Sequence, residues 1–317
     1  PTCHKRMPTH NPVIDFGAHY YPEDLDTSNR PGTSVEKRTG YDRIHDPNTQ
    51  TTEMNDAGVD AMVHSMPYFL GHEDADRTAK ANDVLLDDVK SYEEFYGLAS
   101  IPIAAGGDAA ATEFERCLDN GFHGGAVDET NIDFLDEQFE PVFEFADRAG
   151  AAIFVHVPHL PNVDYRLNAT LGREHRLAKS IIKVVHSGLL DSYPNLNLVY
   201  HHLGGNIASM MGRIHLHTDE NRWPGQESMK TFEEFKRQLE DRIYIDTCGF
   251  FGYHAPIRAA LEEFPASQLL FGTDYPWEPR SADEISKFTE VITESTSKEA
   301  AVDILGLNAL DLLVNVD

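Results

Sequence analysis

The chain has 317 residues, of which 53 are acidic and 26 are basic, so its formal net charge at neutral pH is −27. A field of that sign opposes binding to nucleic acids and to anionic membrane surfaces. The carboxylates are dispersed along the chain, a pattern typical of proteins kept soluble in concentrated salt, and we expect a halophilic origin. The hydrophobic fraction of 41% is sufficient for a large core.

The cysteine count and the hydropathy indicate a cellular location. Cys3, Cys117 and Cys248 are too few and too widely spaced for a disulfide framework or a cysteine zinc site. The first residues include no apolar stretch of signal-peptide length, and no segment approaches the length of a membrane span. We therefore expect a cytoplasmic protein that does not enter a membrane.

Short apolar runs rich in β-formers alternate with longer segments of helical period, which predicts βαβ units and a parallel sheet. Glycines 58, 121 and 150 follow three of the helical segments, as helix C-caps do. Strands are expected at residues 13–21, 61–67, 96–103, 124–127, 152–158, 196–203, 243–247 and 269–273. Helices are expected at residues 49–57, 78–95, 110–120, 135–149, 177–193, 208–219, 231–240 and 254–264. Eight parallel strands predict a somewhat distorted (β/α)8 TIM barrel, with residues 1–317 as a single domain.

Two stretches are longer than ordinary connections, residues 23–46 after the first strand and residues 160–176 after the fifth. Both are predicted to be loop insertions. Loops that follow barrel strands lie on the catalytic face, so both are candidate covers for a substrate.

Several side chains near that face are candidates for substrate binding. His159 follows the fifth strand, where a solvated loop position is the alternative. Arg166 and Arg173 could bind a substrate carboxylate in bidentate fashion, although ion pairing on the acidic surface is the simpler role. Trp277 could form a pocket wall or cap the core.

Four strand ends bear side chains that can bind a metal: His19, His156, His202 and Asp274. An imidazole or carboxylate at the end of an apolar strand is costly without a partner. Because parallel barrel strands open on one face, we expect these four side chains to form a single metal-centred site.

The first strand fixes which face His19 occupies. Side chains alternate along a strand, so Asp15, Gly17 and His19 should point into the barrel while Phe16 faces the helices. The same alternation predicts that the adjacent His201 and His202 point to opposite sides, and we expect His201 to be a structural or supporting residue. Asp246, near the end of the seventh strand, could orient a ligand.

The chain resembles the amidohydrolase superfamily, in the amidohydrolase-related branch that includes aminocarboxymuconate semialdehyde decarboxylase and the resorcylate-type decarboxylases. The resemblance spans nearly the whole sequence. Its most specific pieces are Phe154-Val155-His156, His202-Leu203-Gly204-Gly205 and Leu270-Phe271-Gly272-Thr273-Asp274-Tyr275-Pro276.

The resemblance implies roles for the four residues at the strand ends. His19, His156 and Asp274 fall on positions that hold a divalent metal, with zinc expected first and manganese as an alternative. His202 falls on the histidine beside the metal-bound water or substrate, a general base or proton donor, and Asp274 is a second catalytic candidate. Dimers are common among relatives, so we expect a homodimer acting on a small molecule.

One departure from the family pattern concerns the first strand. Relatives have His-x-His or Glu-x-His there, whereas this chain has Gly17-Ala18-His19, and Gly17 supplies no ligand. Two histidines and an aspartate can still hold a divalent metal. Three outcomes stay open: a three-ligand metal enzyme, a metal-free enzyme using His202 and Asp274, or a binding protein with a degenerate site.

The leading expectation is a metal-dependent lyase that decarboxylates a small unsaturated or aromatic carboxylic acid. A metal-dependent hydrolase that opens a lactone or an amide on the same barrel is the alternative.

Overall fold

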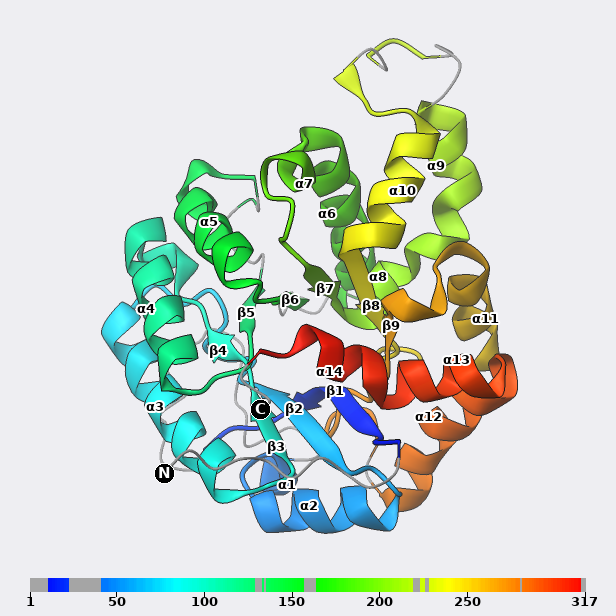
Figure 1. Ribbon diagram of the computed structural model, residues 1–317. Coiled ribbons are helices and arrows are strands. Elements are labelled where there is room, and N and C mark those ends of the chain that lie inside the picture. The colour runs from blue at the N-terminus through cyan, green and yellow to red at the C-terminus, as the bar shows by residue number, and fades with distance from the viewer. Residues whose placement is uncertain are drawn as a thin grey trace.

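The fold is α/β, with parallel strands inside and helices around them (Figure 1). No helix among the described residues is long and apolar enough to cross a membrane. The computed structural model describes residues 11–22, 41–128, 133, 135–156, 164–218, 223–225, 228–279 and 281–314.

Every predicted strand is found, and all strand pairs are parallel. The third predicted strand consists of two short strands on either side of Leu98. One sheet has the order β1 (Ile14–His19), β2 (Ala61–Ser65) and β3 (Phe95–Gly97). The other has the order β4 (Ala99–Ser100), β5 (Gly125–Asp128), β6 (Ile153–His156), β7 (Leu198–Tyr200), β8 (Ile243–Asp246) and β9 (Leu269–Leu270).

Hydrogen bonds connect β1 to the segment after β9. The amide of Phe16 donates to the carbonyl of Phe271 at 2.8 Å. The buried carboxylate of Asp15 accepts from the amide of Thr273 at 3.0 Å and from its hydroxyl at 2.5 Å. Asp15 therefore has a structural role between two distant segments, and burial raises its pKa to about 6.

The helices agree with the predicted periodicity, and the glycines after three of them adopt left-handed backbone, with φ of +77° at residue 58, +110° at 121 and +65° at 150. The predicted helix at 177–193 is broken at Gly188. The helices at 41–44, at 201–206 (where a strand was expected to continue to residue 203) and after residue 281 were not predicted. The helices are α1 (Tyr41–Ile44), α2 (Pro47–Asp56), α3 (Ala75–Ser91), α4 (Gly107–Asn120), α5 (Glu140–Ala149), α6 (Arg173–Ser187), α7 (Leu189–Ser192), α8 (His201–Asn206), α9 (Met211–Thr218), α10 (Phe232–Arg242), α11 (His254–Glu263), α12 (Ala282–Ser295), α13 (Lys298–Val302) and α14 (Asn308–Leu312).

The two predicted loop insertions have different outcomes. Of the first, residues 23–40 are not described, and α1 follows. Of the second, residues 160–163 are not described, and most of the rest is helical: a short 3-10 turn at Asp164–Arg166, a π-helical turn at Asn168–Gly172 and the start of α6 at Arg173.

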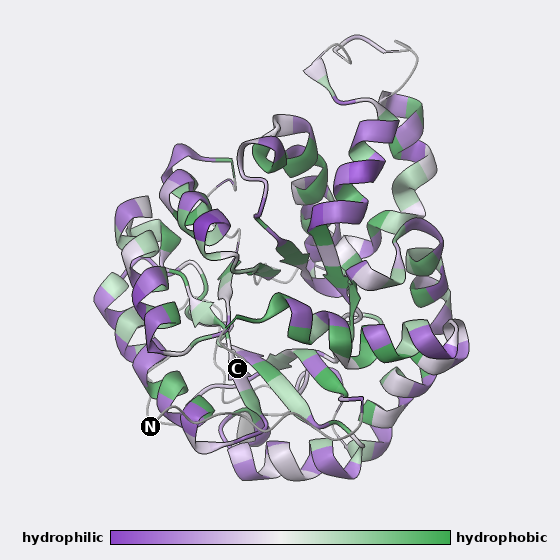
Figure 2. Cartoon of the chain, in the orientation of Figure 1, coloured by the Kyte–Doolittle hydropathy of each residue, from purple (hydrophilic) through white to green (hydrophobic). Residues whose placement is uncertain are grey.

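The core consists of two apolar clusters. One is built mainly from strand residues, among them Phe16, Val63 and Phe154. The larger includes the inner faces of the helices, with residues such as Leu85 and Ile181. In Figure 2 the strands are largely hydrophobic and the outer helix faces largely hydrophilic, as expected for amphipathic helices on a sheet.

The expected alternation along β1 is wrong. Phe16 contacts Phe154 of β6, with ring centroids 6.1 Å apart, and His19 contacts His156 of the same strand at 5.0 Å. Phe154 and His156 share one face of β6, so Phe16 and His19 share a face although they are three residues apart. A register shift between Asp15 and Ala18 accounts for the extra residue. This irregularity places His19 in the interior.

Candidate metal centre

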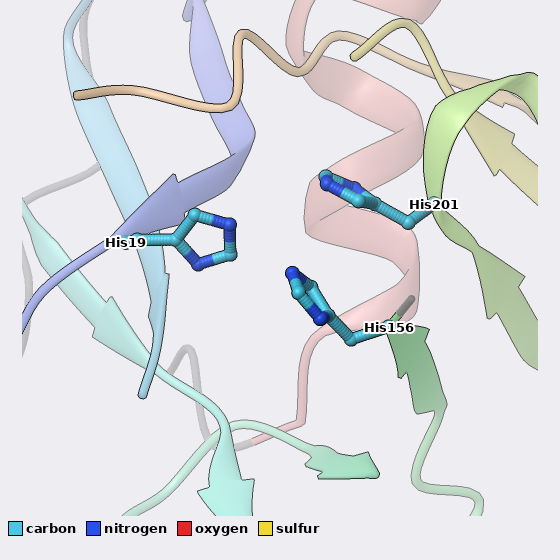
Figure 3. A group of neighbouring side chains, drawn as sticks. All are labelled: His19, His156 and His201. Carbon is cyan, nitrogen blue, oxygen red and sulfur yellow. The ribbon is translucent and has the colours of Figure 1, made fainter. Parts of the chain in front are cut away.

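Three histidines from three strand ends face one another (Figure 3). The ring centroids of His156 lie 5.0 Å from those of both His19 and His201, and the latter two are 5.8 Å apart. One nitrogen from each ring lies within 4.8 Å of the others. The three rings therefore enclose a space of the size that a metal ion occupies.

Asp274 adds a carboxylate to this group. It lies in the turn after β9, beyond the strand end where it was expected, and its φ of +57° directs it back towards the histidines. Its Oδ1 is 3.0 Å from Nε2 of His19 and 3.9 Å from Nε2 of His201. Its Oδ2 is 3.6 Å from Nε2 of His202. One carboxylate thus lies among three imidazoles.

The prediction that His201 and His202 point to opposite sides is wrong. Their ring centroids are 4.0 Å apart, and both rings face the site. Strand β7 ends at Tyr200, and His202 and Leu203 have left-handed backbone with φ of +55° and +50°. Side-chain alternation holds only within a strand, so it does not separate these two rings.

The outer nitrogens of three of these rings have protein partners that fix their orientation. Such carboxylate or hydroxyl contacts orient histidines that bind metals and keep the other nitrogen directed at the ion. The contacts are His19 Nδ1 with Ser65 Oγ at 3.0 Å, His201 Nδ1 with Asp246 Oδ2 at 2.5 Å and His202 Nδ1 with Glu174 Oε1 at 2.9 Å.

Four buried ring nitrogens of this group have no hydrogen-bond partner among the described residues. They are Nε2 of His19, His201 and His202, and Nδ1 of His156. Buried polar atoms are normally paired, so this concentration of unpaired nitrogens is unusual. Nε2 of His19 lies 3.0 Å from Asp274 Oδ1 without forming a hydrogen bond. Tetrahedral bonds of about 2.0–2.1 Å place two ligand atoms about 3.3 Å apart, so the residues present fit a divalent cation.

Burial and charge favour the ionisation states that a metal ligand needs. Burial lowers the pKa of His19 and lowers that of His156 well below its usual range, so both rings present a neutral lone pair. Burial raises the pKa of Asp274, but the neighbouring imidazoles outweigh it and hold that pKa well below its usual range. Asp274 is therefore a carboxylate.

His202 has a different electrostatic environment. Burial lowers its pKa, but the carboxylates of Glu174 and Asp274 outweigh burial and raise it to about 10. This ring favours its protonated form.

Glycine 205 helps to bring Glu174 to His202. A Cβ at that position would lie 1.9 Å from the carbonyl oxygen of Glu174, so only glycine allows α8 to approach α6 so closely. The approach explains why the glycine pair follows the two histidines in the sequence.

Asp246 and Cys248 form another potential ligand group with His201. However, Asp246 Oδ2 accepts from the His201 ring, and its Oδ1 accepts from the amides of His202 and Cys248. Burial raises the pKa of the Cys248 thiol well above its usual range, so it stays protonated. Both residues support the centre, as the sequence suggested for Asp246.

Cys248 occupies the volume that a side chain at residue 17 would need. A Cβ on Gly17 would lie 2.2 Å from Cys248 Sγ, and both residues are buried. The amide of Asp274 also donates to this sulfur, at 3.1 Å. The Cys248 thiol therefore packs directly against the backbone of Gly17, and any side chain at residue 17 would displace it.

Replacing Gly17 by alanine should therefore destabilise the protein by about 1–3 kcal/mol, the usual cost of overpacking a core. Thermal unfolding of Gly17→Ala, Cys248→Ala and the double variant measures the coupling. The double variant should recover most of the loss caused by the glycine substitution. Additive losses would contradict the contact.

The structure describes only some of the residues predicted to bind substrate. His159 lies outside the described residues, and Arg166 is exposed with a φ of +57°, so their roles stay predictions. Trp277 is half-buried and its amide donates to the carbonyl of Asp274 at 2.7 Å. Arg173 is half-buried at the start of α6, where its charge acts on His156, and its Nε has no partner among the described residues.

Sequence reasoning missed three supporting residues: Ser65, Glu174 and Glu278. Glu278 accepts from the amide of Gly249 at 3.1 Å, and burial and the charge of Asp274 raise its pKa to about 7. Ser65 ends β2, a position that could have been noticed. Glu174 precedes His202 by 28 residues and has no local signal.

A cavity of about 610 Å³ lies beside the centre. It is lined by residues of α6 and α9 and by Phe250, and none of the histidines of the cluster lines it. Glu174 borders both the cavity and His202.

The model of the amidohydrolase family matches residues 14–313. The chain belongs to the amidohydrolase family. The chain is 28% identical over 221 residues to gamma-resorcylate decarboxylase of Rhizobium sp. (strain MTP-10005), a match covering 63% of this chain. The chain spans 65% of that relative's length.

Two further similarities extend over more of the amidohydrolase. It is 24% identical to 2-amino-3-carboxymuconate-6-semialdehyde decarboxylase of Dictyostelium discoideum, over 83% of this chain and 77% of the relative. A solved dihydroxybenzoic acid decarboxylase from Polaromonas sp. JS666, with bound manganese and the inhibitor 2-nitroresorcinol, superposes with a TM-score of 0.76. That match has 22% identity and covers 96% of this chain and 97% of that one, so the two chains share an α/β fold. The predicted resemblance to this branch of the family is confirmed.

Proposed function

We propose that this member of the amidohydrolase family is a metal-dependent decarboxylase of a small aromatic or unsaturated carboxylic acid. The observation that carries the proposal is the buried group of unpaired imidazole nitrogens around Asp274. Both relatives named above are decarboxylases, which supports the same reaction class here.

We further propose that the two sheets form one closed (β/α)8 barrel and that the chain is a single domain. The hydrogen bond from Phe16 to Phe271 supports closure between β1 and the segment after β9. At the other junction, between β3 and β4, the amide of Leu98 donates to the carbonyl of His64 at 2.9 Å and supports closure there.

His19, His156 and Asp274 would hold the metal. A bound divalent cation supplies a Lewis acid for the oxygens of the substrate and for the charge that develops as the C–C bond breaks. The nitrogen-rich residues favour zinc, whereas manganese in the Polaromonas protein supports the alternative.

The chain's own residues have two tasks in this reaction. Arg173 binds the substrate carboxylate, because its guanidinium is close enough for its charge to act on His156 and its Nε lacks a partner among the described residues. His202 delivers a proton from Nε2 to the carbon that loses CO2. Glu174 favours the protonated ring that this step requires.

The direct test is CO2 release from dihydroxybenzoates and related hydroxybenzoates by protein loaded with zinc or manganese, with chelator-treated protein as the control. We expect turnover that depends on the metal. Hydrolysis of a lactone such as dihydrocoumarin without any CO2 release would instead favour the hydrolase. Binding of the acids without turnover would favour a binding protein.

Arg173 and Arg166 can be distinguished by kinetics. Replacing Arg173 by glutamine should raise KM by about 10–100-fold, since hydrogen bonds to charged groups contribute about 1.5–3 kcal/mol, while kcat changes less. The matched substitution Arg166→Gln removes an exposed guanidinium and should leave KM within about 2-fold. The reverse ranking would assign the carboxylate to Arg166.

Three properties stay predictions. A cytoplasmic location suits the free thiols of Cys117 and Cys248. A homodimer and a halophilic origin follow from the family resemblance and from the charge of −27, respectively.

A further inference from the structure

The cluster holds more donors than the three predicted ligands. Gly17 offers none, but His201 brings an imidazole that the sequence assigned to the opposite side. His201 is fully buried, and its Nε2 has no hydrogen-bond partner among the described residues. A buried ring nitrogen left unpaired needs an explanation.

Position distinguishes His201 from the adjacent His202. His201 groups with His19 and His156, each offering a nitrogen within 4.8 Å of the others. Its Nε2 also lies on the Oδ1 side of Asp274, at 3.9 Å, and Oδ1 is the oxygen 3.0 Å from His19.

His202 lies on the other side of the carboxylate. Its Nε2 is 3.6 Å from Oδ2, and it groups with His201 and Asp274 only. The Oδ1 side therefore holds His19 and His201, and His156 groups with these two rings, whereas His202 is outside that set of histidines.

Asp246 holds His201 in the orientation that a ligand needs. Its Oδ2 accepts from Nδ1 of His201 at 2.5 Å, and its Oδ1 accepts from the amide of His202 at 2.9 Å. With Nδ1 committed to the carboxylate, Nε2 carries the free lone pair in the neutral ring. Asp246 is itself fully buried, which restricts movement of the pair.

We propose that His201 is a metal ligand and completes a four-residue site of His19, His156, His201 and Asp274, in place of the side chain that Gly17 lacks. The inference rests on the metal centre in the proposed function and deepens it. Three imidazoles and one carboxylate form a tetrahedral set of the kind that binds zinc and cobalt more tightly than manganese. His202 is then free of the metal and available to the substrate.

Cobalt(II) alone is the probe, because tetrahedral cobalt has an intense visible spectrum that reports its ligands without any turnover. Affinity is measured by competition with a chelator. His201→Gln should weaken cobalt binding by more than about 100-fold, beyond the 10–100-fold typical of supporting residues, and should change the visible spectrum of any bound metal. The substitution His202→Asn at the neighbouring ring is the control and should leave affinity within about 3-fold and the spectrum unchanged.

A second measurement does not depend on whether His201→Gln folds. X-ray absorption at the zinc edge of zinc-loaded protein should count three imidazole ligands in wild type and three in His202→Asn. A count of two in wild type, or wild-type cobalt affinity and spectrum in His201→Gln, would overturn the inference.

The outcomes separate this inference from the proposed reaction. Wild-type protein that binds cobalt through three imidazoles but releases no CO2 from any acid keeps the inference and rejects the decarboxylase. Wild-type protein that binds neither cobalt nor zinc rejects both.

Discussion

Replacement of Asp274 by asparagine should remove the metal and lower kcat/KM by about 10³-fold, or about 4 kcal/mol of transition-state stabilisation. The carboxylate is the one negatively charged side chain among the proposed ligands, and its oxygens lie 3.0–3.9 Å from Nε2 atoms of three histidines. The amide is nearly isosteric, so the loss should come from charge and metal affinity, which should fall by more than about 100-fold. Elemental analysis after dialysis gives the metal content, and steady-state kinetics gives kcat/KM.

The same chemical change at the surface is the control. Asp87 is exposed on α3, and Asp87→Asn should retain full metal content and activity. Full metal content in Asp274→Asn would show that the carboxylate is not a ligand. Retained activity together with lost metal would favour the metal-free mechanism.

Much of the fold follows from local sequence, because the period of apolar residues and the turn-forming glycines are local signals. The strands and the left-handed glycines at 58, 121 and 150 were predictable in this way. The helices after residue 281 were missed.

The site was predictable to the extent that it follows strand ends. His19, His156 and Asp274 do meet, as the topology of parallel strands requires. The exception is the pair of His201 and His202. Val199 packs in the strand cluster and Tyr200 in the other, so regular alternation directs His201 inward, whereas His202 faces the site through its left-handed backbone. Positive φ is uncommon for residues other than glycine, so no sequence rule predicts the direction of His202.

The register shift in β1 is another feature that the local sequence does not predict. A one-residue register shift between Asp15 and Ala18 reverses the inward face, and nothing local to Phe16 signals it. Contacts with distant residues decide it, because Cys248 fills the space beside Gly17. Likewise, Glu174 reaches His202 only because α6 and α8 approach at Gly205.

Substitution of His202 by asparagine should lower kcat by about 10²–10⁴-fold, the usual contribution of a positioned acid or base, without loss of metal. The amide nitrogen of asparagine approximates Nδ1, so the hydrogen bond to Glu174 can persist while Nε2 is removed. Single-turnover CO2 release and elemental analysis measure the two effects. A fall in metal content would place His202 among the ligands.

The pH dependence of Glu174→Gln tests the protonation state. Glu174 and Asp274 raise the pKa of His202 to about 10, so removing the charge of Glu174 should lower that pKa. Activity that requires the protonated ring is present below this pKa and is lost as pH rises through it. The alkaline limb of kcat should therefore move to lower pH in Glu174→Gln. A proton-accepting role predicts the opposite, because activity would then rise with pH through the same pKa and the variant would gain activity near neutrality.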